Sequence, residues 1–165
     1  MQKVAVIFCM SVRRRRLKLS SKHNKLEIAI VEEFYPCFAP DAKLIYGGGM
    51  AQKNFVFDKA AFAKLDIPVS EHEKFPNVIL YDSKKKWLFL IEAMTRHNLV
   101  SPKRQFELEK LFEKCKAGKI YVTAFLDFAS YGKYADDVAW ETEVWIAEMP
   151  SHMIHLNGDK FLGPR

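Results

Sequence analysis

The amino-acid sequence predicts a single α/β (α+β) domain in which a central sheet is flanked by helices. Three observations support this prediction. An amphipathic segment precedes a series of short apolar segments, a second amphipathic segment interrupts that series, and glycine, proline or polar turns separate the segments. Hydrophobic residues make up 49% and charged residues 28% of 165 positions, so the chain can bury a sizeable core. This composition excludes a disordered or collagen-like protein.

The first predicted element is a helix that ends near Pro36. Leu26, Ile30 and Phe34 recur at four-residue spacing, which is typical of one apolar helix face. Glu33 follows Ile30 by three residues, so its carboxylate points toward the apolar side. Glu33 is therefore either a candidate site residue or a carboxylate at the edge of the face with its head group in water.

The central elements are a short strand at 43–46, ended by glycines, and a hairpin made of strands 76–82 and 87–93. If Asp82 pairs with Trp87 across the polar turn, the same register places Asn77 opposite Glu92. A slip of one residue would move every side chain to the other face of the sheet and break this pairing.

Glu92 stands near the end of an otherwise almost wholly apolar strand, which we expect to be buried in the centre of the sheet. An ionised carboxylate in that place requires compensation, because an unpaired buried charge is costly. A metal ion, a lysine or the uptake of a proton would each supply it.

A second helix is predicted to begin after Ser101, an N-cap residue followed by Pro102, and to run to about Lys116, closed by Gly118. Lys103 and Arg104 occupy its first turn, where cations oppose the helix dipole. Either a function other than helix stability favours these two residues, or the position tolerates them as long, solvated side chains.

The remaining elements are strands at 120–126, 140–148 and 152–156. His152 and His155 are three residues apart, so a strand places them on opposite faces. That spacing argues against a metal ion shared by the two histidines.

Positive charge is concentrated at the N-terminus. The formal net charge is +6, and residues 1–26 contain eight basic residues and no acidic one, while the rest of the chain carries 18 basic and 20 acidic residues. The run formed by Arg13, Arg14, Arg15 and Arg16 suits contact with nucleic acid or a membrane surface. A solvated tail has the same composition.

Cysteine usage and the first apolar run indicate a cytoplasmic protein. Cys9, Cys37 and Cys115 are widely spaced and form no CxxC pair, which argues against a disulfide framework or a zinc ribbon. The apolar run at 4–10 precedes the arginines instead of following them, so it does not match a secretory signal. It is also far shorter than the ~20 residues that span a bilayer, and we expect no membrane association through it.

Longer blocks of the sequence carry a family resemblance. The order of helix, three-strand meander, helix and strand, with a carboxylate at the end of the third strand, is similar to the PD-(D/E)XK nuclease core. From about residue 20 onward the chain resembles the C-terminal catalytic domain of the BsuBI/PstI type II restriction endonucleases, notably in LFLIEA, SPKR and WETEVWIAEMPSHMIHLNG. The resemblance implies a PD-(D/E)XK restriction-endonuclease-like core over 20–165, with a central mixed sheet flanked by helices, preceded by a basic leader of uncertain status at 1–19.

The resemblance also implies a function. Enzymes of this family hydrolyse phosphodiester bonds at specific sites in palindromic duplex DNA, as part of restriction-modification, with Mg²⁺ as cofactor and Mn²⁺ as a substitute, and they act as homodimers. Mg²⁺ requires hard oxygen ligands. The implied metal ligands are Glu92 and Asn77, with Lys103, and Arg104 second, supplying the positive charge that Met94 cannot, and Glu33 as a helix carboxylate. The expected DNA contacts come from Arg13, Arg14, Arg15, Arg16, Lys103 and Arg104.

Two positions depart from the family pattern. Asn77 stands where the family generally carries an aspartate. Gly49 replaces a second aspartate, because the chain reads Gly48-Gly49-Met50 where the family tends to read Gly-Asp-Thr. These losses leave catalysis open, and the alternative is a truncated, catalytically degenerate relative that only binds DNA or dimerises. A basic-tailed domain that binds RNA or single strands is a further alternative, but the sequence has no stacking motif for it.

Overall fold

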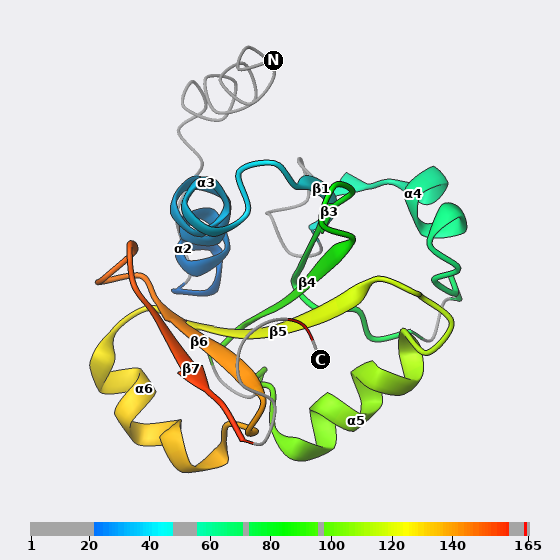
Figure 1. The fold of residues 1–165 in the computed structure, drawn as a ribbon. Helices are drawn as coiled ribbons and strands as arrows, with labels where there is room; N and C mark the ends of the chain where they lie inside the picture. The colour runs from blue at the N-terminus through cyan, green and yellow to red at the C-terminus, as the bar shows by residue number, and fades with distance from the viewer. Residues whose placement is uncertain (1–21, 48–55, 71–72, 96–97, 159–163, 165) are drawn as a thin grey trace.

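The computed structural model describes residues 22–47, 56–70, 73–95, 98–158 and 164. Its centre is a seven-stranded mixed sheet with the order β2-β1-β3-β4-β5-β6-β7 (Figure 1). The strands are β1 (Lys43–Gly47), β2 (Val56–Phe57), β3 (Val78–Asp82), β4 (Trp87–Ala93), β5 (Gly118–Phe125), β6 (Thr142–Ile146) and β7 (Met153–Leu156). The helical segments are α2 (Lys22–Ala29), η1 (Ile30–Phe34), α3 (Tyr35–Phe38), α4 (Lys59–Lys64), α5 (Pro102–Leu111), α6 (Phe128–Tyr134) and η2 (Ala135–Asp137). The predicted fold class is confirmed.

The strand directions divide the sheet into two parts. Strands β2, β1, β3 and β4 are antiparallel, β4, β5 and β6 run parallel, and β7 returns antiparallel to β6. The predicted hairpin register is confirmed, because Asp82 pairs with Trp87 and Val78 pairs with Ile91. Asn77 precedes the first ladder pair, and the same register continued by one residue sets it opposite Glu92.

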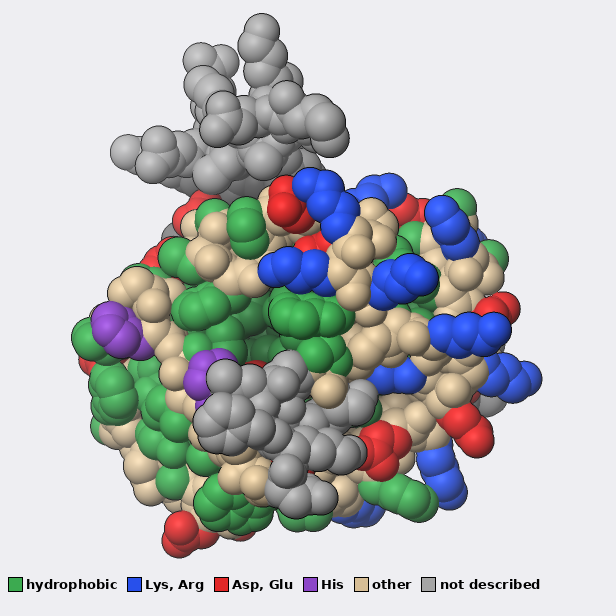
Figure 2. Space-filling model, viewed as in Figure 1, with side chains coloured by type: hydrophobic (Ala, Val, Ile, Leu, Met, Phe, Trp, Pro, Cys, Tyr) green, Lys and Arg blue, Asp and Glu red, His purple; other side chains and the backbone are tan. Residues whose placement is uncertain are grey.

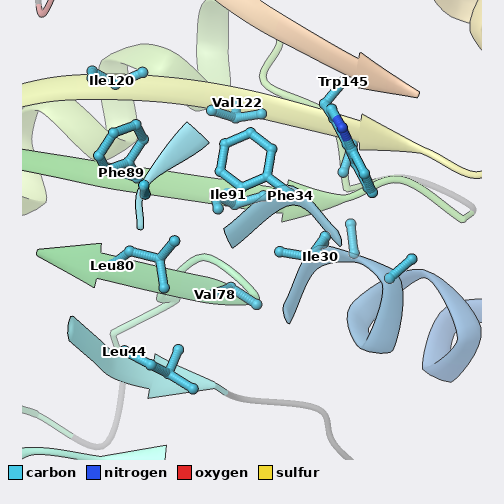
Figure 3. Packing of buried hydrophobic residues seen from close by; sticks show 14 of the residues in the cluster. Ile30, Phe34, Leu44, Val78, Leu80, Phe89, Ile91, Ile120, Val122 and Trp145 are labelled. Atoms are coloured by element: carbon cyan, nitrogen blue, oxygen red, sulfur yellow. The ribbon is translucent and has the colours of Figure 1, made fainter. Parts of the chain in front are cut away.

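Helices cover both faces of the sheet (Figure 1). On one face, Ile30 and Phe34 of η1 pack with Leu80, Phe89 and other strand residues in the largest apolar cluster (Figure 3). The fully buried Trp145 of β6 lies edge-on to the Phe34 ring, with centroids 5.7 Å apart. On the other face, α4 and α5 bury their apolar residues against β3 and β4, and α6 packs against the ends of β5 and β6. The result is a three-layer α/β/α domain.

The first helix, predicted to end near Pro36, continues two residues further, to Phe38. Its central part, η1, is a π-helix in which the Tyr35 N–H donates to the Ile30 carbonyl oxygen. Pro36 then falls in the first turn of α3, directly after the wider turn of the π-helix. The prediction treated proline as a terminator, whereas here it opens a new helical turn.

The second helix is shorter than predicted. Helix α5 ends at Leu111, and Gly118 is the first residue of β5 and not a helix cap. A Cβ at position 118 would lie 2.6 Å from Pro164 Cβ, so glycine allows the chain near the C-terminus to pack on the start of β5. The predicted N-cap is confirmed, since Ser101 Oγ accepts from the Arg104 N–H at 3.2 Å.

Four short elements were not predicted: β2, the short segment η2 and the two helices α4 and α6. Each of the two helices begins at an aspartate whose side chain accepts a backbone N–H three residues on, namely Asp58 and Asp127. These caps were a usable signal, but the segments are too short to show a helical period. Across the described ranges, no helix is both long enough and apolar enough to cross a bilayer.

Candidate active site

A hollow of about 520 Å³ lies beside the carboxyl-terminal end of β4 and the first turn of α5. It is lined by Tyr46, Glu73, Lys74, Phe75, Asn77, Glu92, Asn98, Leu99, Ser101, Lys103, Arg104 and Glu107. Four of these residues were selected from the sequence, namely Asn77, Glu92, Lys103 and Arg104. The fold thus brings together side chains from the hairpin and from the second helix.

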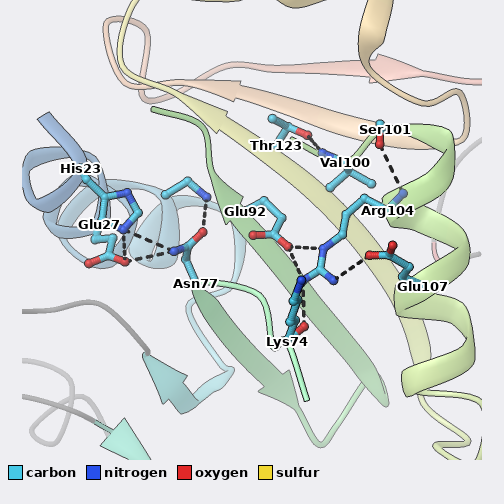
Figure 4. A network of polar contacts seen from close by, with 11 residues as sticks. His23, Glu27, Lys74, Asn77, Glu92, Val100, Ser101, Arg104, Glu107 and Thr123 are labelled. Carbon is cyan, nitrogen blue, oxygen red and sulfur yellow. Dashed lines mark hydrogen bonds and ion pairs between the residues drawn. The ribbon is translucent and has the colours of Figure 1, made fainter. Parts of the chain in front are cut away.

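Glu92 is buried at the floor of this hollow and is ion-paired with Arg104 (Figure 4). Arg104 Nε and Nη2 both lie 2.8 Å from Glu92 Oε1. Burial raises the pKa of Glu92 above its ordinary value, and Arg104 and the backbone N–H of Asn77 oppose that rise only in part. The compensation required by the buried carboxylate is therefore supplied by an arginine, which was not among the three possibilities considered from the sequence.

Arg104 is itself held by further partners. Its Nη2 donates to the Lys74 carbonyl oxygen at 2.8 Å, and its Nη1 lies 3.3 Å from Glu107 Oε2. The segment before α5 is fixed as well, because the Val100 N–H donates to Thr123 Oγ1 and the Val100 carbonyl accepts from the Ala139 N–H. The guanidinium therefore projects into the hollow from an anchored helix start.

Asn77 faces a second polar group, contributed by α2 (Figure 4). Its Nδ2 donates to Glu27 Oε1 at 3.2 Å, and His23 Nε2 lies 3.0 Å from the same oxygen. Asn77 Oδ1 accepts from the Ala93 N–H at 2.8 Å, which fixes the orientation of the amide. His23 is held in turn by Thr95, whose Oγ1 lies 3.2 Å from His23 Nδ1.

The side chains of Asn77 and Glu92 are thus engaged in different directions. The backbone register places them side by side, but Asn77 bends toward Glu27 while Glu92 meets Arg104 (Figure 4). Asn77 is in a bend just before β3, so strand alternation does not fix its direction. The bend brings the amide to the helix that carries the second buried carboxylate.

Glu27 is the site residue that sequence reasoning missed. Its side chain is fully buried, and within the described part of the chain its Oε2 has no hydrogen-bond partner. Burial raises the pKa of Glu27, while His23 and Asn77 lower it to a smaller extent. The signal was present in the sequence, since Glu27 precedes Ile30 by three residues and Phe34 by seven.

The other sequence-derived candidates fall in different places. Lys103 is exposed at the rim of the hollow. Glu33 lies half-buried in η1 and is not among the described residues that line the hollow. The arginine run 13–16 and Gly49 lie outside the described residues.

The raised pKa of Glu27 predicts a pH-dependent stability. The folded chain binds this proton more tightly than the unfolded chain, so the free energy of unfolding falls as pH rises above the ordinary value of 4.5. We expect Glu27→Gln to flatten this decline and to raise stability near pH 8 by on the order of 1 kcal/mol, or about 2–4 °C in Tm. Thermal melts between pH 5 and 8, at about unit intervals, test this.

The matched control for this variant is Glu32→Gln, which neutralises an exposed carboxylate five residues along the same helical segment. It should leave the slope of Tm against pH as in the unaltered chain. A Glu27→Gln protein that keeps the full slope would show that the buried carboxylate does not control it.

The donor atoms of the hollow are suited to a hard divalent cation. Glu92 and Asn77 line it and each carries a side-chain oxygen, and Asn77 binds the carboxylate of Glu27, whose second oxygen is unpartnered among the described residues. No three His, Cys, Asp or Glu side chains in the described ranges form a metal-binding group. Mg²⁺ does not require one, because it is usually held by one or two protein oxygens together with water and substrate phosphate.

Comparison with known proteins relates this chain to an enzyme family. The model of the BsuBI/PstI restriction endonuclease domain matches residues 9–159. The chain belongs to this family. The match starts inside the segment predicted as a leader, and the boundary at residue 19 stays a prediction.

Individual members of the family show the same relationship. The type II restriction enzyme BsuBI of Bacillus subtilis is 46% identical over 143 residues, which cover 87% of this chain and 45% of that enzyme. The type II restriction enzyme AplI of Arthrospira platensis is 37% identical over 87 residues, 53% of this chain and 27% of that enzyme. The solved structure of SdaI restriction endonuclease has a TM-score of 0.79 and 38% identity, covering 88% of this chain and 46% of that chain.

The chain spans less than half the length of these relatives. With SdaI the chain shares the fold over 88% of its length. For this chain, the activity of the longer enzymes is therefore a proposal.

Proposed function

We propose that this domain hydrolyses phosphodiester bonds in duplex DNA at specific palindromic sites, as a type II restriction endonuclease, with Mg²⁺ or Mn²⁺ bound at the hollow. The observation that carries the proposal is that Asn77, Glu92, Lys103 and Arg104 all line one hollow. The family relationship supports cleavage and does not favour the alternative of a degenerate relative that only binds DNA or dimerises.

Each residue of the hollow has a proposed role. Glu92 and Asn77 hold the cation through oxygen atoms, and the Glu27 carboxylate keeps the Asn77 amide in place by accepting from its Nδ2. When bound, a divalent cation lowers the pKa of an attacking water and stabilises charge on the phosphate oxygens. Lys103, exposed at the rim, is suited to contact the phosphate beside the cleaved bond.

Arg104 has a different proposed role from Lys103. Its guanidinium already neutralises Glu92 and binds the Lys74 carbonyl and Glu107. It therefore sets the charge and position of the carboxylate, and it leaves the phosphate to Lys103. Because Glu92 is neutralised in the free protein, we expect cation binding to be weak until DNA phosphate adds further oxygen ligands.

Palindromic sites are matched by two-fold symmetric proteins, so we propose that the active form is a homodimer. The arginine run 13–16 supplies additional phosphate contacts in this proposal. Sedimentation of the purified chain with and without a palindromic duplex measures the assembly. A chain that stays monomeric in both conditions would contradict it.

Cleavage of plasmid DNA tests the proposed function. We expect discrete fragments with Mg²⁺ or Mn²⁺, and a loss on the order of a hundredfold or more for Glu92→Gln, since the substitution removes the charged oxygen ligand. The control is Glu109→Gln, which changes an exposed carboxylate on α5, outside the lining of the hollow.

The Glu109→Gln protein should cut at the unaltered rate. Circular dichroism and thermal melts show whether each variant remains folded. Equal cleavage by the Glu92→Gln protein would exclude Glu92 as a ligand, and an unaltered protein that cuts no duplex with either ion would contradict the proposed function.

A further inference from the structure

Two lysine-rich loops meet at the end of the sheet opposite the hollow. The β3–β4 turn covers 83–86, and the segment between α5 and β5 covers 112–117. They are joined where β5 begins, because the Gly118 N–H donates to the Lys86 carbonyl at 2.9 Å. We call the exposed lysines of these loops the basic end, and they are Lys84, Lys85, Lys86, Lys114 and Lys116.

The basic end is built on ordered structure. The buried Asp82 carboxylate accepts the N–H groups of Lys84 and Lys85 at 2.9 and 3.0 Å, which fixes the turn. The second loop is anchored by the buried side chains of Phe112 and Cys115. The lysines therefore occupy defined positions, unlike those of an unstructured charged tail.

Positive charge is more concentrated at this end than in residues 27–165 as a whole. The two loops contain five lysines and one glutamate, whereas residues 27–165 as a whole have 18 basic and 20 acidic residues. In the space-filling view, Lys and Arg side chains gather at the upper right, over the end of the hairpin (Figure 2). The charge of one lysine, Lys84, is partly offset, because its Nζ lies 3.3 Å from Asp41 Oδ1. Both side chains of this ion pair are exposed.

We propose that the basic end is a second contact surface for duplex DNA, which binds the phosphate backbone without reading sequence. The hollow and the basic end lie at opposite ends of β4, and its residues 87 and 92 are roughly 17 Å apart at about 3.3 Å per residue. A surface at that distance from the hollow adds affinity without taking part in the chemistry.

The composition of the surface favours DNA over a protein partner. Protein interfaces are centred on buried aromatic or aliphatic anchors. The large apolar side chains exposed in the described ranges are Val69, Phe106, Phe128, Trp140 and Met149, and none belongs to either loop. Lysines without an apolar centre are typical of contact with the regularly spaced charges of a nucleic-acid backbone.

The test measures binding without cleavage. A labelled duplex lacking the recognition sequence is titrated without divalent ions at several salt concentrations, using the unaltered chain and the triple variant Lys84→Gln, Lys85→Gln and Lys86→Gln. We expect the variant to bind more weakly and to lose up to about 0.9 in the slope of log K against log salt for each phosphate contact removed. Adding Lys114→Gln and Lys116→Gln should reduce the slope further.

The control carries the same change of net charge elsewhere. Lys59, Lys64 and Lys133 are exposed on α4 and α6, and their triple glutamine variant should keep the unaltered slope. An unchanged slope in the basic-end variant, as an acidic protein partner would give, overturns the proposal. An equal loss in both triple variants also overturns it, because it shows only an effect of net charge.

The outcome is separate from that of the proposed function. Glu92→Gln should bind this duplex with the unaltered slope while losing cleavage, and the basic-end variant should still cut a short duplex of about one helical turn around the site. If the unaltered chain does not cleave DNA, the proposed function fails, and the salt dependence of binding still tests the basic end.

Discussion

Replacing Arg104 by glutamine is expected to lower the free energy of unfolding by about 3–5 kcal/mol at neutral pH. The substitution leaves the Glu92 side chain, which is 4% exposed, as a buried charge without its ion-pair partner. The loss should shrink at acidic pH, because burial already raises the pKa of Glu92 and protonation removes the charge. Urea unfolding at pH 5 and pH 8 measures both values.

Substituting the other partner of this ion pair should have a smaller effect on stability. Glu92→Gln leaves Arg104 with the Lys74 carbonyl and Glu107, so we expect it to lower stability less than Arg104→Gln does. The double variant Glu92→Gln with Arg104→Gln should be more stable than Arg104→Gln alone, since no buried charge is then left unpaired. A loss below about 1 kcal/mol for Arg104→Gln would mean that the pair behaves as a surface ion pair.

Asn77→Asp is expected to lower stability by roughly 1–3 kcal/mol at neutral pH when no divalent ion is present. The substitution replaces the Nδ2 donor, 3.2 Å from Glu27 Oε1, with a carboxylate oxygen. Two adjacent carboxylates raise the pKa of one of them, so the loss should disappear at acidic pH. Mg²⁺ or Mn²⁺ should restore stability in proportion to binding, which thermal melts and calorimetric titration measure.

A swapped pair is the control for this variant. With Asn77→Asp and Glu27→Gln together, the amide and the carboxylate exchange places and the hydrogen bond between the two positions is kept. This double variant should be close to the unaltered chain in stability without metal. If Asn77→Asp alone is as stable as the unaltered chain and gains no divalent-ion response, the repulsion inferred from the structure is absent.

The parts of the fold predicted correctly depend on local patterns. The hairpin register followed from Asp82 and Trp87 on either side of a polar turn, and Ser101 was recognised as an N-cap from its place before a proline. The shorter α5 was not predicted, because the apolar spacing continues through Phe112 and Cys115, which are buried in a turn and a loop. Apolar spacing indicates burial, and it fixes the backbone conformation less strictly.

The site was predicted only in part. Asn77, Glu92, Lys103 and Arg104 were selected and do line one hollow, whereas Glu27 was missed in favour of Glu33. Both glutamates fit an apolar helix face by spacing, and only the packing of α2 against the sheet shows which one is buried. The partner of Glu92 could not be chosen because the path of the chain between β4 and α5, which decides where Arg104 reaches, has no sequence period.

The two hydrogen bonds of the Val100 main chain restrict motion at the start of α5. Its N–H is bound to the Thr123 hydroxyl of β5, and its carbonyl is bound to the segment that leads into β6. A displacement of the start of α5 would break both bonds, so the helix start that carries Lys103 and Arg104 is tied to the parallel half of the sheet. If the domain binds DNA as proposed, we expect adjustment at the opposite wall, where Lys74 lies in an irregular segment. One wall of the hollow is therefore preformed, and the other can adapt. Ordering the second wall on binding would add to the entropic cost of association.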